Sequence, residues 1–275
     1  QGYRTLAVDV EAIFDEFSFG DPDPHAIRRF IRYAIAEWEE PAPSLVLLVG
    51  DAHWDYRNRT GLSFRNYVPT FVPPERPHEE GSDLWFAQAV SAEAEASLAS
   101  LPDVFLARIP AGATEEIETA VRKFIRYEAE QEFGPWRSRI LFTNDHGFRR
   151  YSNEVVKQTL PEWMRFDHFD FEEYPLEDYY RIQMLSPETK GHTKTSPEAT
   201  RDLVERLNEG TLFWDYMGHG GAFVLSNSDL FIGTERYDAD VLRLTNRERL
   251  NFFLSLSCLT GYFYQQGLTT AGKLQ

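Results

Sequence analysis

The sequence contains a single cysteine, Cys258, and few basic residues for a chain of 275. One thiol forms no internal disulfide and cannot build a tetrathiolate zinc or iron–sulfur site. With 28 Lys and Arg against 44 Asp and Glu, the formal net charge is −16, which repels nucleic acids and anionic membrane surfaces. No apolar run approaches the roughly 20 residues of a membrane-spanning helix, and no basic segment with an apolar run after it opens the sequence. We therefore expect neither a nucleic-acid partner nor a membrane span.

What the sequence does contain is a repeating order of amphipathic helix and apolar strand. Hydrophobic residues make up 42% of the chain and aromatic residues 15%, enough for a large core. Asp23 and Pro24 are residue types that begin helices, and apolar residues recur at helical spacing from there to Trp38. The segment 44–51, SLVLLVGD, then predicts a short, fully buried strand.

The same order returns later in the chain. Thr114 begins a second amphipathic helix, whose buried side is predicted to hold Ile117, Val121, Phe124 and Ile125. Residues 197–208 predict a third helix, and three more apolar strands end in polar residues: RILFTNDHG (139–147), TLFWDYMGHGG (211–221) and LNFFLSLSCLTG (250–261). This alternation predicts a doubly wound α/β fold with mostly parallel sheets and helices on both faces. The turn at Gly134 is the candidate boundary between two subdomains, residues 1–134 and 135–275.

Polar residues with catalytic chemistry follow the ends of these strands. They are Asp51 and His53 after the first strand, and then Asp145 with His146, His219 and Cys258 after the later ones. Ligands bind outside the carboxyl ends of parallel strands, so we expect the side chains to gather at one edge of a sheet.

Cys258 and His219 have the chemistry of a nucleophile and its acid/base. Their separation along the chain allows one crossover between parallel strands, so that thiol and imidazole can emerge side by side. An imidazole can take the proton of a thiol and return one to a leaving amine, and the N–H groups of Gly220 and Cys258 are natural donors to an oxyanion. A lone cysteine is also commonly a small apolar core residue, and this structural interpretation stays open.

Residues 211–221 and 250–263 resemble the two signature blocks of the gingipain family of cysteine peptidases, relatives of the caspases and legumains. Upstream blocks are similar in order: YRTLAVDVEAIFDEFSFG with DPHAIRRFIRYA, LVLLVGDAHWD, Ser82-Asp83, VFLARIPAG and VRKFIRYE. The resemblance covers nearly the whole chain. It implies a caspase-like fold and a cysteine endopeptidase, secreted or on the cell surface, that requires no cofactor and acts on proteins or peptides.

The resemblance also implies roles for individual residues. Cys258 matches the nucleophile and His219 the acid/base, and a third, carboxylate residue is expected after the strand that precedes the histidine block. Asp145 fits that place, although a shift of one residue would select His146. An aspartate that only caps a turn is the equally open structural interpretation.

Three positions depart from the family pattern and are candidates for contacts with the substrate. Many relatives have Trp where this chain has Leu225, and Ala where it has Ser257. Arg-specific relatives place an acid in a region that here includes Arg149, so cleavage after arginine does not follow. If Arg149 lines the pocket, it favours an acidic or polar substrate residue; an exposed arginine is otherwise a solvated charge.

The family domain extends further at both ends, so the chain resembles an excised or processed piece with an exposed strand edge. The remaining parts of a larger precursor are therefore candidate partners. Asp51, His53 and Asp83 either belong to a structural calcium site, as in relatives, or are solvated loop residues, which we favour.

Three other functions remain open. An amine could replace water in the second step, which would make the protein a transpeptidase. A degenerate peptidase domain could serve as a surface or assembly module. The segments GDAHWD, NDHG and GHGG also resemble loops of metal-dependent phosphoesterases, but the His-x-His arrangement of those enzymes is missing, so we predict no catalytic metal.

Overall fold

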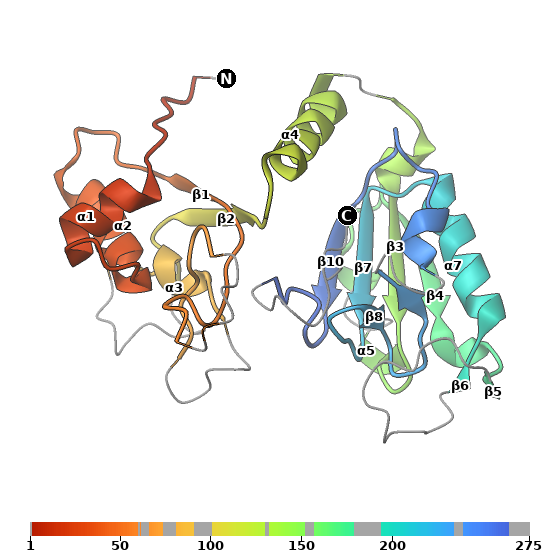
Figure 1. Ribbon diagram of the computed structural model, residues 1–275. Helices are drawn as coiled ribbons and strands as arrows, with labels where there is room; N and C mark the ends of the chain where they lie inside the picture. The colour runs from red at the N-terminus through yellow and green to blue at the C-terminus, as the bar shows by residue number, and fades with distance from the viewer. Residues whose placement is uncertain are drawn as a thin grey trace. The chain divides into compact units, whose positions relative to one another are not determined.

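The computed structural model describes residues 2–59, 61, 66–73, 81–90, 101–129, 132–151, 157–178, 194–233 and 239–263 (Figure 1). These residues divide into two compact units, one up to Arg122 together with Phe263 and the other from Lys123 to Tyr262. The sequence suggested a division near Gly134, whereas this one falls inside helix α4 (Thr114–Ala129). The end of α4 belongs with the second unit because the Tyr127 ring lies 5.9 Å, centroid to centroid, from Phe252 of strand β10 (Phe252–Leu256).

The first unit contains helices α1 (Val10–Ser18), α2 (Pro24–Glu37) and α3 (Leu84–Ala87), strands β1 (Leu45–Val49) and β2 (Phe105–Ile109), and the start of α4. Caps determine where the longer helices begin. The carboxylates of Asp9 and Asp23 accept hydrogen bonds from the N–H groups of Glu11 and His25, at 3.0 and 2.9 Å. The predicted helix start at Asp23 is confirmed, whereas periodicity did not predict α1.

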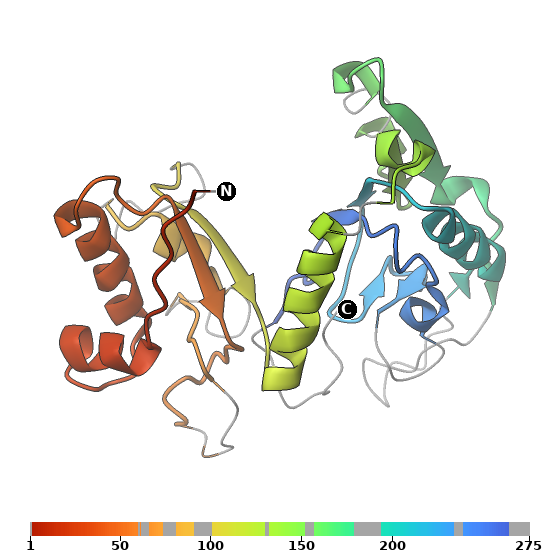
Figure 2. The ribbon, with the colours of Figure 1, turned by 90° about the horizontal axis from the view of Figure 1, so that it is seen from above.

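Strands β1 and β2 pair in parallel along their whole length. One face of the pair is buried, since Leu48 packs with apolar residues of α1, α2 and α3, and α1 and α2 lie on the same side of the sheet (Figure 2). On the other face Leu45, Leu47 and Val49 are 56%, 57% and 40% exposed. The prediction of a fully buried strand at 44–51 is therefore wrong, because no helix among the described residues of this unit covers the second face.

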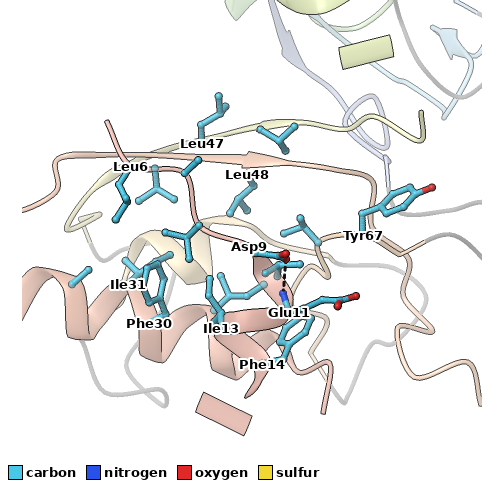
Figure 3. Close-up of a pocket in the computed structure, with 18 of the residues that line it drawn as sticks. Leu6, Asp9, Glu11, Ile13, Phe14, Phe30, Ile31, Leu47, Leu48 and Tyr67 are labelled. Carbon is cyan, nitrogen blue, oxygen red and sulfur yellow. Dashed lines mark hydrogen bonds between the residues drawn. The ribbon is translucent and has the colours of Figure 1, made fainter. Parts of the chain in front are cut away.

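A cavity of about 1090 Å³ lies within the first unit, between the N-terminal segment 6–9, helices α1 and α2, and strand β1 (Figure 3). Its lining is mainly apolar and includes Leu6, Ile13 and Leu48, with the carboxylates of Asp9 and Glu11 toward one end. None of the residues predicted to be catalytic lines this cavity.

The second unit is built on a four-stranded parallel sheet in the order β10-β7-β3-β4, with strands β3 (Arg139–Asn144), β4 (Arg165–Asp170) and β7 (Phe213–Met217) beside β10. Two antiparallel pairs accompany it, β5 (Glu177–Asp178) with β6 (Lys194–Thr195) and β8 (Val224–Leu225) with β9 (Phe231–Ile232). The helical segments are α5 (Arg149–Tyr151), α6 (Lys157–Thr159), α7 (Pro197–Glu209), η2 (Pro135–Ser138), η4 (Phe171–Glu173) and η5 (Asp240–Arg243). The predicted strands β3, β7 and β10 and the α/β class with mostly parallel sheets are confirmed; β4 was not predicted.

Helix α7 covers one face of this sheet (Figures 1 and 2). Its start is capped by Ser196, whose hydroxyl accepts a hydrogen bond from the N–H of Ala199 at 3.3 Å. The period-2 alternation of β7 turns Trp214 and Tyr216 toward the helix, where they share a buried core with Leu203. The helix predicted over 197–208 is confirmed.

The predicted buried side of α4 is exposed. Helix α4 has no buried residue, and Val121, Phe124 and Ile125 are 41%, 57% and 60% exposed. The amphipathic pattern is present, but within the part of each unit that the structure describes no sheet or helix buries this stripe. Amphipathic spacing predicted the helix correctly and its burial wrongly.

Candidate active site

The carboxyl ends of β3, β7 and β10 lie side by side at one edge of the four-stranded sheet. In register, Asn144 is opposite Met217, and Met217 is opposite Leu256. Because the strands are parallel, the residues that follow them emerge at the same edge. The structure places three of the predicted residues there: Asp145, His219 and Cys258.

The turns that contain His219 and Cys258 are in direct contact. The N–H of Gly218 donates to the carbonyl oxygen of Leu256 at 3.3 Å, which continues the β7–β10 pairing into the turns. A Cβ built on Gly220 would lie 2.7 Å from the carbonyl oxygen of Cys258 and 2.8 Å from the hydroxyl of Ser257. Only glycine permits this approach, so the sequence Gly-His-Gly serves the packing of one strand end against the next.

The side chains of both predicted catalytic residues are open to solvent. Cys258 is an exposed, free thiol, and His219 is exposed as well. In the part of the chain that the structure describes, the N–H groups of Gly220 and Cys258 donate no hydrogen bond. A thiol, an imidazole and two N–H groups without an acceptor among the described residues therefore lie on turns that meet at this edge of the sheet.

Asp145 is 1% exposed and binds the main chain next to His219. Its Oδ2 accepts the N–H of His219 at 3.1 Å, while Oδ1 accepts the hydroxyl of Ser226 at 2.7 Å and the N–H of His146 at 2.8 Å. Among the described residues, none of its hydrogen bonds reaches the imidazole of His219. The carboxylate thus holds the backbone of His219.

His146, the alternative to Asp145, lies apart from the His219 ring contacts. Its imidazole packs edge-on against Phe171, with ring centroids 4.6 Å apart, on the side of η4. The ring that contacts His219 instead belongs to Phe148, at 5.4 Å and an interplanar angle of 88°. An apolar edge therefore borders the imidazole of His219 on one side.

Tyr216 and Ser226 complete the arrangement and were not singled out from the sequence. The hydroxyl of Tyr216 donates to the carbonyl oxygen of His219 at 2.6 Å, and the N–H of Ser226 donates to the same oxygen at 2.8 Å. Burial raises the pKa of Tyr216, and the charge of Asp145 adds to this effect, so the hydroxyl stays protonated as a donor. The only sequence signal for Tyr216 is the alternation of β7, which turns it toward the core.

The residues predicted to contact the substrate have different surroundings in the structure. Leu225 is 2% exposed and packs in the core with Trp214 and α7, so its assignment to the substrate pocket is wrong: a buried side chain presents no surface to a peptide. The guanidinium of Arg149 pairs with Asp170 at 2.9 Å and Glu173 at 3.1 Å. Carboxylates of the same unit therefore balance its charge.

Ser257 takes part in a ring of three hydroxyl groups at the base of the cysteine turn. Its Oγ lies 2.7 Å from that of Ser255 and 3.1 Å from Oγ1 of Thr260, which in turn donates to Ser255 at 2.9 Å. The ring joins the end of β10 to the residues after Cys258. The hydroxyl of Ser257 therefore helps to hold the turn that contains Cys258.

The unassigned polar residues of the first unit are bound within that unit. Arg108 holds Asp83 through two hydrogen bonds, from Nε at 2.6 Å and from Nη2 at 2.8 Å. Nδ1 of His53 accepts the N–H of Asp55 at 2.9 Å, and the carbonyl oxygen of Asp51 accepts two N–H groups. Over the described residues, no group of three or more His, Cys, Asp or Glu side chains is placed to hold a metal ion. The calcium alternative stays open, whereas the favoured interpretation as solvated loop residues is wrong for Asp51 and His53, which are 4% and 0% exposed.

The sequence matches a known protein family over nearly its whole length. A sequence model described as peptidase family C25 matches residues 1–274. A sequence search of curated proteins finds no match. Among the helices that the structure describes, none has the length and apolar character to cross a membrane.

Solved structures share the fold at low sequence identity. The Arg-specific cysteine proteinase gingipain R (RgpB) superposes with a TM-score of 0.59 and 18% identity, over 90% of this chain and 48% of that chain. The complex of Porphyromonas gingivalis RgpB pro- and mature domains gives 0.60 and 17%, over 94% and 55%. A structure described only as a protease gives 0.53 and 15%, over 88% and 44%. The chain therefore spans about half the length of these proteins, and it belongs to peptidase family C25, a family of gingipain-type cysteine peptidases with a caspase-like fold.

Proposed function

We propose that this chain hydrolyses peptide bonds, with Cys258 as the nucleophile and His219 as the acid/base. The observation that carries the proposal is the contact between their two turns at the ends of β7 and β10, with both side chains exposed. A thiolate and an imidazole at neighbouring strand ends are the parts that covalent cysteine catalysis requires.

The reaction proceeds in two steps. His219 takes the proton of the Cys258 thiol, and the sulfur attacks the carbonyl carbon of the scissile bond. The tetrahedral intermediate collapses as His219 donates that proton to the departing amine, which leaves an acyl-enzyme on the sulfur. His219 then takes a proton from water, and the hydroxide attacks the acyl carbon. The carbon–sulfur bond breaks, the carboxylic acid product leaves, and His219 returns its proton to the sulfur.

The oxyanion of the intermediate is proposed to bind the N–H groups of Gly220 and Cys258. Two observations support this role: neither N–H donates a hydrogen bond among the described residues, and Gly220 touches the main chain of Cys258. Donors that are oriented before the charge develops stabilise the transition state without reorganisation.

Asp145 is proposed to act through the main chain of His219. Family resemblance suggested a third, carboxylate residue in the site, and the hydrogen bond from the His219 N–H to Asp145 favours a role through the main chain of His219. Its burial and full set of partners suit a structural carboxylate that keeps the turn in place.

Substrate preference is proposed from what borders His219. The Phe148 ring offers an apolar wall, and the charge of Arg149 is balanced by Asp170 and Glu173. Gingipain R is Arg-specific, but this site has no observed acid that would select arginine among the described contacts of His219. We propose protein or peptide substrates without a requirement for arginine.

The protein's surroundings are proposed from its relatives. One matched structure is a complex of pro- and mature domains, which supports the remaining parts of a larger precursor as partners. Family membership supports a secreted or cell-surface location.

A peptide-library cleavage profile tests the function. Wild type is compared with Cys258→Ala and His219→Ala, and with Leu242→Ala as a control at a 66% exposed position. Both site variants should lose at least about 10³-fold in kcat/KM, while the control keeps the wild-type rate. Equal cleavage by wild type and Cys258→Ala would show that another group is the nucleophile.

The same assay separates the alternatives. Ligation of an added peptide amine in preference to hydrolysis would identify a transpeptidase. A Cys258 that iodoacetamide labels no faster than free cysteine would identify a degenerate module. Activity restored by a divalent metal and unaffected by thiol alkylation would identify a phosphoesterase.

A further inference from the structure

Both main-chain polar groups of His219 are hydrogen-bonded, although its ring is exposed. The N–H donates to Oδ2 of Asp145 at 3.1 Å. The carbonyl oxygen accepts from the Tyr216 hydroxyl at 2.6 Å and from the Ser226 N–H at 2.8 Å. The residue is therefore held on both sides of its Cα, while the imidazole remains open to solvent.

The three residues that hold His219 are buried and linked to one another. Tyr216, Ser226 and Asp145 are 0%, 2% and 1% exposed. The Ser226 hydroxyl donates to Oδ1 of Asp145 at 2.7 Å, which closes a ring of hydrogen bonds through Asp145, His219 and Ser226. Buried hydrogen bonds cannot exchange partners with water, so this ring is stiffer than an ordinary exposed turn.

We propose that Tyr216 and Ser226, together with Asp145, are positioning residues that orient the imidazole of His219 through its main chain; the inference rests on the proposed function. With the N–H and the carbonyl oxygen both held, the direction of the Cα–Cβ bond is fixed. The ring then keeps only its two side-chain torsions, and Phe148 lies at its edge, 5.4 Å away. A carboxylate on the imidazole is not needed to orient it.

The same clamp places an oxyanion donor. The peptide bond between His219 and Gly220 contains both the clamped carbonyl oxygen and the N–H of Gly220. Since peptide groups are planar, holding that oxygen from one side directs the N–H of Gly220 to the other. Tyr216 and Ser226 thus set the orientation of the base and of one donor to the transition state.

Two conservative variants test the proposal. Tyr216→Phe and Ser226→Ala each remove one hydroxyl from the clamp and leave the side-chain packing nearly unchanged. Each should lower kcat about 10- to 100-fold with KM within about threefold of wild type, because substrate binding is kept and the reacting groups are misplaced. The control is Tyr174→Phe, which removes the hydroxyl of a half-buried tyrosine in the same unit; this hydroxyl is bonded to Asp202 and not to His219.

A second measurement distinguishes positioning from general loss of stability. The rate at which iodoacetamide alkylates Cys258 should fall in both variants, since a misplaced imidazole takes the proton of the thiol less readily. In a His219→Ala background, Tyr216→Phe should change neither alkylation nor residual hydrolysis. Unchanged kcat and an unchanged alkylation rate in the single variants, or equal losses in Tyr174→Phe, would overturn the clamp.

Amide hydrogen exchange of His219 tests the clamp without relying on activity. The amide should be protected in the wild type and should exchange at least about tenfold faster in Ser226→Ala, because Asp145 loses the hydroxyl that holds it. An unprotected His219 amide in the wild type contradicts the clamp even if Cys258 is the nucleophile. A protected amide beside an unreactive Cys258 contradicts the proposed function alone.

Discussion

Gly218 and Gly220 flank the candidate base, and each lets another residue approach the main chain more closely than a side chain would allow. A Cβ on Gly218 would lie 2.3 Å from Cβ of Asp145, and one on Gly220 would lie 2.7 Å from the carbonyl oxygen of Cys258. In the structure they let the chain approach itself, which is what brings three strand ends together.

Gly220→Ala is therefore expected to push the histidine and cysteine turns apart. The clash is with backbone and with the short Ser257 side chain, which cannot swing away, so we expect a loss of about 1–3 kcal/mol in unfolding free energy and a fall of about 10²-fold in kcat. Urea denaturation and peptide hydrolysis measure the two effects. Gly261→Ala is the matched control in the cysteine turn, because a Cβ there would meet nothing within 4 Å. Similar losses in both variants would contradict this account.

Asp215 is a half-buried carboxyl on β7, facing away from α7. Its Oδ1 is buried, and within the described residues it has no hydrogen-bond partner. Burial raises the pKa of Asp215. The unfolded chain therefore releases this proton at a lower pH than the folded chain does, so the group lowers the free energy of unfolding as pH rises above its ordinary pKa of 3.8.

Asp215→Asn is expected to be more stable than wild type at pH 7 and equally stable near pH 3. The amide has nearly the same shape and no charge to desolvate. Urea titrations at the two pH values measure the difference, with Asp178→Asn, at an exposed carboxylate of β5, as the control. A variant less stable than wild type at pH 7 would mean that the carboxylate has a favourable partner.

Helices α7 and α4 show how similar patterns lead to different burial. Both are amphipathic, and both begin where their sequences predict. Five residues of α7 are buried against the sheet, whereas none of α4 is. The pattern determines which stripe of a helix is apolar, and the neighbouring element determines whether that stripe leaves water.

A pair of truncations tests this contrast. Leu203→Ala on α7 should lower the unfolding free energy by about 2–5 kcal/mol, because it opens a cavity at a fully buried position. Ile125→Ala on α4, at a 60% exposed position, should change it by no more than about 0.5 kcal/mol. Chemical denaturation of both variants measures the difference. A loss at Ile125 as large as that at Leu203 would mean that the α4 stripe is covered in solution.

At the scale of the molecule, the described chain has two separate hydrophobic cores. One gathers α1, α2 and α3 around β1 and β2, and the other gathers α7 and the β8–β9 pair against the four-stranded sheet. The residues proposed for catalysis all belong to the second unit. The active-site geometry can therefore be described from one core alone.

The net charge of −16 belongs to the whole molecule and does not describe the surroundings of His219. Around His219, the buried carboxylate of Asp145 is satisfied by N–H and hydroxyl donors, and the nearest ring is apolar. Overall charge thus disfavours nucleic acid as a partner but does not predict which side chain the candidate site would accept.

The positions of three predicted site residues could be predicted because they depend on the local order of strand and turn, and on the rule that parallel strands end at the same edge of a sheet. Apolar strands followed by polar turns placed Asp145, His219 and Cys258 at strand ends, and parallel pairing places strand ends at one edge. The prediction failed where burial decided the role: Leu225, expected to contact the substrate, lies in the core. It was incomplete where hydrogen bonds decided the role, because Tyr216 and Ser226 carry no motif.

The sequence by itself determined the α/β class and the placement of Asp145, His219 and Cys258 after strand ends, because periodicity and turn residues act over a few positions. Tertiary structure alone decided which apolar faces are covered and which groups hold His219. The hydrogen bond between Ser226 and Asp145 joins residues 81 positions apart, and the free energy of such a contact depends on a neighbour that no local pattern specifies.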